Sequence, residues 1–221
     1  MNKKWTLAAL SLAAGIAAIN TASASTITGT IWETTTGIAQ NAVPGNVPPS
    51  MIPGTKGVTF SGPSDPVSFN PTDGSAVYTL GTWLSSEGAT GTYFGGAAPT
   101  DSLDATITNI TGTVSVTTGE TFSVSHDDGV TLIIGGVTVI NDPGPTSVVD
   151  SLATYTGASG NQAFQLVYGE CCGAPATLVV SLPLNSVPEL STWGMMAVGF
   201  GAIGFLAYRR GRPAKALALS A

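Results

Sequence analysis

Two adjacent carboxylates are the residues of this 221-residue chain whose types and spacing point most directly to chemistry. Asp127 and Asp128 lie between two apolar runs, at 122–124 and 130–134, whose β-branched residues are typical of buried strands. Two negative charges at such a junction are unfavourable unless a cation shares them. Ca²⁺ prefers about six to eight oxygen ligands, which Asp and Glu side chains supply. The pair therefore predicts a calcium site.

A second interpretation of the pair needs no metal. The tripeptide at 127–129 ends in Asp-Gly, which favours tight turns, so it could simply connect two strands. The residues alone do not decide between a calcium site and a turn.

The surrounding segments carry a family resemblance. Residues 121–141 read TFSVSHDDGVTLIIGGVTVIN, in which Asp-Asp lies between apolar strands and Gly-Gly follows. Later come Leu-Val-Tyr at 166–168, a short loop at 169–173, and a strand ending in Leu-Pro at 182–183. In this order the segments resemble the protective-antigen-type (PA-fourteen) β-sandwich, and especially its lectin branch in fungal flocculins and adhesins.

The resemblance implies a metal centre. In that family a cis peptide joins the two Asp, and both bind Ca²⁺, which would assign this role to Asp127 and Asp128. Glu170 stands two positions after the Tyr, where the family usually has an Asn ligand, and a Glu can still bind the ion. Carbonyl groups near Cys172 would add ligands. The loop is one residue shorter than usual and lacks its aromatic residue, which bears on sugar choice more than on metal binding.

Cys171 and Cys172 are the two cysteines of the chain. In an oxidising compartment a bond is expected more than free thiols, and neighbours can form a vicinal disulfide. That bond would stiffen the loop beside the proposed metal. Two free buried thiols, or bridges between chains, stay open as alternatives.

The first 24 residues predict a secretory signal peptide. A basic start at 1–4 precedes an apolar run at 5–19, and Ala-Ser-Ala at 22–24 fits a small-x-small cleavage site. The chain is therefore expected to be exported.

The C-terminal segment resembles the PEP-CTERM sorting signal of Gram-negative bacteria. A short motif, an apolar helix at 193–208 and an Arg cluster follow one another, with Leu190 where Pro is usual. The residues that carry the resemblance are Val187, Pro188, Glu189, Trp193, Arg209 and Arg210. It implies a signal at 187–212, processed by an exosortase and tied to exopolysaccharide export. Residues 213–221 would be a cytoplasmic tail at the inner membrane. An unprocessed membrane anchor is the alternative.

Between these segments lies a strongly acidic body, residues 25–186. Lys56 is its one basic residue against twelve Asp and Glu, which gives a net charge of −11. Nucleic acid is excluded as a partner, because there is no basic patch to release counterions. A cation such as Ca²⁺ is favoured, since it offsets self-repulsion.

The body is expected to fold as one all-β domain, an antiparallel β-sandwich. Gly- and Pro-rich turns recur between short alternating segments, and no helical period is sustained. Residues 117–120 are predicted to form a hairpin turn, and 92–96 belong to a Gly-rich loop. The other expected strands are 25–32, 58–60, 77–84, 103–116, 147–156, 163–168 and 176–183.

Catalysis is not expected. His126 is the one histidine, no nucleophile-elbow serine is present, and zinc would need more His or Cys. The sequence favours an extracellular, calcium-supported, carbohydrate-binding module of lectin type, linked to exopolysaccharide or biofilm. Trp83 and Tyr93 are expected as loop-side sugar contacts, together with Glu170. The alternatives are a structural or adhesion matrix protein without a ligand, and an ice-binding protein. The last requires a flat, regular Thr array, and the sequence shows no fixed-period Thr repeat.

Overall fold

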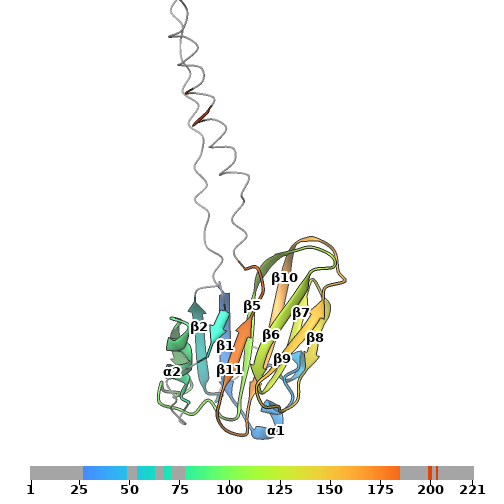
Figure 1. Cartoon of the computed structure of the whole chain (residues 1–221). Helices are drawn as coiled ribbons and strands as arrows, with labels where there is room; N and C mark the ends of the chain where they lie inside the picture. The colour runs from blue at the N-terminus through green and yellow to red at the C-terminus, as the bar shows by residue number, and fades with distance from the viewer. Residues whose placement is uncertain are drawn as a thin grey trace, which may run out of the picture.

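Two antiparallel sheets packed face to face form a β-sandwich, as predicted (Figure 1). The structure is a computed structural model that describes residues 27–48, 54–62, 67–70, 78–184, 199–200 and 203. The signal peptide at 1–24 and nearly all of the sorting segment and tail at 187–221 lie outside the described residues. Within the described residues, no helix has the length and apolar character needed to span a membrane.

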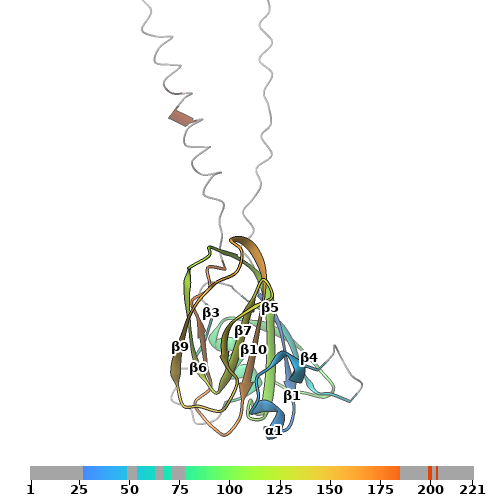
Figure 2. The same ribbon diagram turned by 90° about the vertical axis from the view of Figure 1, so that its right-hand side faces the viewer.

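The larger sheet has seven strands in the order β4-β2-β1-β5-β10-β7-β8. These strands are β1 (Ile27–Glu33), β2 (Gly57–Gly62), β4 (Thr90–Phe94), β5 (Thr106–Val116), β7 (Gly129–Ile134), β8 (Val137–Asp142) and β10 (Gly160–Glu170). The smaller sheet has the order β3-β11-β6-β9. Its strands are β3 (Val67–Phe69), β6 (Thr121–Asp127), β9 (Val149–Thr154) and β11 (Thr177–Val180). Figure 2 shows the layers from the side, with β9, β6 and β3 in one and β5, β1 and β4 in the other.

The chain changes sheet repeatedly. It crosses between β5 and β6, between β6 and β7, and between β10 and β11. The predicted hairpin at 117–120 is therefore wrong, because the strands on either side of it belong to different sheets. A true two-residue hairpin joins β7 to β8 at Gly135 and Gly136, whose φ angles of 57° and 79° favour glycine.

An aromatic stack lies in the core between the sheets. Trp83 stacks on Phe69 with ring centroids 3.9 Å apart, and on Tyr168 at 5.8 Å. Trp83 comes from a helix, α2 (Leu80–Ser86), so the predicted strand at 77–84 is wrong. The reason is local: Thr79 and Thr82 form a capping box that starts a helix.

The edge strand β4 replaces the predicted Gly-rich loop. Gly91 lies in this strand, and its position has no room for a side chain. A Cβ there would come within 2.5 Å of Val58 Cγ2 and 3.0 Å of Leu84 Cδ1. The glycine thus marks a close approach between the strand and α2, and not a break in the strand.

A short segment covers one end of the outer face of the larger sheet. It contains α1 (Thr36–Ala39) and a 3-10 turn, η1 (Pro44–Asn46). Ala42 from this segment packs with Trp32, Ile107 and Val167 in a second apolar cluster. Gly169 of β10 permits the contact, because a Cβ there would lie 2.1 Å from the Ala39 carbonyl oxygen. The segment is therefore packed closely beside the end of β10.

Candidate calcium and ligand site

Two crossings between the sheets meet at one end of the sandwich. β6 ends at Asp127 in the smaller sheet, and β7 begins at Gly129 in the larger sheet. β10 ends at Glu170 and the chain then crosses to β11. The crossings lie side by side, because Thr177 pairs with Asp127 and Gly169 pairs with Gly129. The segment 127–129 is thus a crossing between sheets and not a turn between paired strands.

These crossings bring three of the predicted metal ligands together. A carboxylate oxygen from each of Asp127, Asp128 and Glu170 lies within 4.8 Å of the others. The three residues are only 5%, 4% and 2% exposed. The peptide bond between the two Asp is cis, as the resemblance implies. Lys56 is the one Lys or Arg among the described residues, and it pairs with Glu33 at 3.8 Å. The cluster therefore has no Lys or Arg partner within the described part of the chain.

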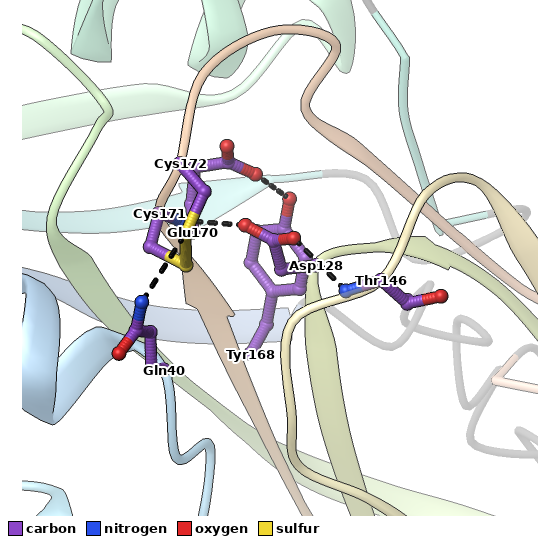
Figure 3. Close-up of a disulfide and its surroundings, with 7 residues drawn as sticks. All are labelled: Gln40, Asp128, Thr146, Tyr168, Glu170, Cys171 and Cys172. Atoms are coloured by element: carbon purple, nitrogen blue, oxygen red, sulfur yellow. Dashed lines mark hydrogen bonds between the residues drawn. A yellow bond between two sulfur atoms is a disulfide. The ribbon is translucent and has the colours of Figure 1, made fainter.

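Backbone amides hold the Asp128 side chain in place. Cys171 N–H donates to Asp128 Oδ2 at 2.8 Å, and Thr146 N–H donates to Oδ1 at 3.1 Å (Figure 3). Thr146 lies far from the motif in sequence, and no sequence signal pointed to it. Amides from two distant segments of the chain thus fix the orientation of one carboxylate.

Burial makes the ionised form of the cluster unfavourable. It raises the pKa of Asp127 to about 6, and the neighbouring charge of Asp128 adds to the rise. Burial also raises the pKa of Asp128, although the Cys171 and Thr146 amides oppose this. Burial raises the pKa of Glu170 to about 9 against the effect of its hydrogen bond from Tyr168, and the two Asp charges contribute. Without a cation, Glu170 therefore keeps its proton at neutral pH, while Asp127 is largely ionised.

Tyr168 links this cluster to the aromatic stack. Its hydroxyl lies 2.6 Å from Glu170 Oε2 and also contacts the Asp127 carbonyl oxygen. One hydroxyl proton cannot serve both acceptors at full strength. A protonated Glu170 resolves this, because it donates to Tyr168, which then donates to Asp127. An ionised Glu170 instead accepts the hydrogen bond of the Tyr168 hydroxyl, in competition with the Asp127 carbonyl.

A second network, of hydrogen bonds through His126, contacts the backbone of Asp128. His126 is fully buried, and its Nδ1 donates to the Asp128 carbonyl, which can only accept. Its Nε2 lies 2.9 Å from Ser151 Oγ, which donates to Asp142 Oδ2. His126 thus supports the crossing through the backbone of Asp128. Asp142 is connected to the backbone of Asp128 through the side chains of Ser151 and His126, so it is not a neutral control for the carboxylate cluster.

Cys171 and Cys172 are joined by a disulfide in the loop that begins directly after Glu170. Gln40 Nε2 donates to the exposed Cys172 sulfur at 3.5 Å (Figure 3). Both sulfurs lie near Asp128, but bonded sulfurs are not thiolates and so do not provide metal ligands. The expected carbonyl ligands near Cys172 remain a prediction.

The structure does not bring the two predicted aromatic residues to this site. Trp83 is 0% exposed with both ring faces stacked, so the prediction that it offers its ring to a sugar is wrong. Tyr93 lies in β4, half-buried against the core, and three strands separate it from β10.

A cavity that the sequence did not predict lies beside Glu170 instead. It has a volume of about 290 Å³, and Glu170 lines it. The other polar residues of its wall are Tyr78, Thr79, Thr100, Ser102 and Asp104. A small polar ligand in this cavity would contact hydroxyl groups of the wall together with Glu170.

No protein-family model matches this chain, and no curated protein matches it. Among solved structures, it is similar to a PA14 sugar-binding domain from an RTX adhesin, with 18% identity and a TM-score of 0.46. That match covers 72% of this chain and 91% of the other. A PA14 domain of the MpAFP antifreeze protein is 21% identical, with a TM-score of 0.45 over 75% and 86% of the two chains. The likeness is one of architecture, and the sugar-binding and antifreeze descriptions belong to those proteins.

We expect the metal-free chain to lose stability as pH rises from about 4.5 to about 9. The folded state keeps the Glu170 proton up to a pKa of about 9, whereas the unfolded chain releases it near 4.5. The folded state then binds more protons across this range, so its free energy of unfolding falls with rising pH. Asp127, with its pKa of about 6, steepens the lower part of the fall.

Urea unfolding in chelator across this pH range measures the effect. Glu170→Gln should remove a large part of the decline and leave the contribution of the other acidic residues. A wild-type stability that stays level or rises over the range would contradict the account.

Proposed function

We propose that this chain is an exported, non-enzymatic carbohydrate-binding module whose ligand site is supported by Ca²⁺. The observation that carries the proposal is the buried cluster of Asp127, Asp128 and Glu170, with no Lys or Arg beside it in the described part of the chain. Its donors are all hard oxygens, which suit Ca²⁺ and do not suit zinc or copper. The residues present therefore fit the ion.

The three carboxylates would hold the ion, and the cavity would hold the sugar. A bound Ca²⁺ supplies positive charge to the cluster and a Lewis-acidic centre that sugar hydroxyls can approach. The chain's own part is to orient Asp128 through the Thr146 and Cys171 amides and to offer hydroxyl groups from the cavity wall. Hydroxyl groups that both donate and accept match those of a sugar.

The cellular setting is a proposal from the terminal segments. We propose that residues 1–24 direct export and that 187–212 act as a PEP-CTERM-type signal read by an exosortase. The body would then bind extracellular polysaccharide at the cell surface or in a biofilm matrix. The alternative is a structural matrix protein without a ligand site. The following test distinguishes it from the carbohydrate-binding function.

We expect calcium-dependent glycan binding that disappears in EDTA. On a glycan array, the full chain should bind in Ca²⁺, and Asp128→Asn should abolish binding because it removes a buried ligand. Ca²⁺ should also raise the melting temperature of the wild type, since it binds the folded state alone. Asp128→Asn should lose most of that rise.

Asp150→Asn is the matched control. Asp150 is exposed on β9 beside Ser125 and Leu152, and the substitution removes the same charge without removing any of the three clustered carboxylates. It should retain both the binding and the rise. Glycan binding that is unchanged by EDTA would overturn the calcium role, and no binding to any glycan would favour the structural alternative.

One observation favours ice binding as a second candidate function. Threonine-rich rows cross four strands on the outer face of the larger sheet, at the end that α1 leaves uncovered. Strand pairing aligns Thr92, Thr59, Thr30 and Asn109 in one row, and Thr90, Ser61, Thr28 and Thr111 in the next. Neighbouring strands lie ~4.8 Å apart, so the hydroxyl groups form a regular array without a repeat in the sequence. A hollow of about 530 Å³ lies on the same face of the sheet. The face is therefore less flat than ice binding requires.

We expect this candidate to show itself as slowed ice growth that does not depend on Ca²⁺. Thr28→Lys should remove the effect, because it places a long charged chain in the middle of the array. Thr154→Lys, exposed on the smaller sheet, should keep it. Ice growth at the same rate with and without the wild-type chain would rule out this function.

A further inference from the structure

Asp104 is a charged residue of the cavity that neither the fold nor the metal cluster uses. It is exposed and lines the cavity together with Glu170. Its backbone N–H donates to Ser102 Oγ at 3.1 Å, but its carboxylate has no hydrogen bond or ion pair among the described residues. Asp104 is also absent from the group of carboxylates close enough to share a metal ion.

The charge of Asp104 acts across the cavity. Asp104 is exposed and shares the cavity wall with Glu170, so a ligand bound there lies close to the Asp104 carboxylate. The cavity therefore lies within the field of a carboxylate that stays in contact with solvent. No Lys or Arg among the described residues lines it.

A bound Ca²⁺ does not cancel this charge. Two positive charges among the carboxylates of Asp127, Asp128 and Glu170 leave the cluster with one negative charge, and Asp104 adds another. A ligand in the cavity thus meets a wall of neutral hydroxyl groups and a net negative potential. An acidic sugar is repelled there, and a sugar with a positive group is attracted.

We propose that Asp104 makes the site selective for amino sugars that carry a free amine, as in a de-N-acetylated polysaccharide, over neutral and acidic sugars. This inference rests on the proposed carbohydrate-binding function. The hydroxyl groups of the cavity contact the sugar ring, while Asp104 contacts its ammonium group. One unit charge about 4 Å away in water is worth ~1 kcal/mol, which corresponds to about a fivefold preference.

A glycan array tests the inference on the full chain in Ca²⁺ at low salt. It carries gluco-, galacto- and manno-configured sugars, each in neutral, N-acetylated, free-amine and uronate form. Within the configuration that binds best, the free-amine form should bind about five times more tightly than the neutral form. The uronate form should bind most weakly. Raising the salt to about 1 M should shrink the preference, because the Debye length falls to about 3 Å.

Asp104→Asn should remove the preference, so that the free-amine and neutral forms bind with the same affinity as each other. Asp150→Asn, which removes an exposed charge on β9, should keep the preference. A preference that survives in Asp104→Asn would show attraction to the acidic surface as a whole and would overturn the inference.

The two proposals fail in different ways. Calcium-dependent binding with equal affinity for neutral and amine forms, or tighter binding of the uronate, overturns the role of Asp104 and leaves the proposed function standing. Calcium-dependent binding to none of the sugars overturns both.

Discussion

Burying three carboxylates together is the constraint on which the rest of this structure depends. Asp127, Asp128 and Glu170 are each at most 5% exposed, and no Lys or Arg of the described chain accompanies them. Coulomb repulsion and lost hydration both oppose this arrangement, and the raised pKa values record that opposition. Either protons or a metal ion must balance the cluster, and a divalent cation supplies two positive charges at once.

The β-sandwich places the cluster where two crossings between its sheets run side by side. Residues from β6 and β10 could not meet within one sheet, because the two strands belong to different layers. Tyr168 then connects the cluster to the core, since its ring continues the stack of Phe69 and Trp83 while its hydroxyl contacts Glu170. The site is thus part of the packing of the domain, so changes in the core should be felt at the carboxylates.

Much of this arrangement could be predicted from the sequence, and the limits have physical reasons. The alternating segments predicted a sandwich, and the family resemblance implied the cis bond and the meeting of Asp127, Asp128 and Glu170, which the structure shows. Trp83 was misplaced because its neighbours alternate like a strand, while the Thr79–Thr82 capping box starts a helix. Thr146 and Ser151 support the site through long-range contacts that no local pattern reveals. The threonine rows likewise arise from the register in which the strands pair. The spacing of Thr along the sequence does not predict that register.

Calorimetric titration of Ca²⁺ into the metal-stripped full chain tests the central claim most directly. Run at neutral pH in two buffers with different ionisation enthalpies, it counts the ions bound and the protons released. One ion should bind, and about one proton should leave the cluster, because Glu170 holds it with a pKa of about 9 in the metal-free state, whereas Asp127, with a pKa of about 6, is already largely ionised at neutral pH. Glu170→Gln should weaken binding and lower the proton release. An absence of binding heat in both buffers, together with an unchanged protonation state, would contradict the account.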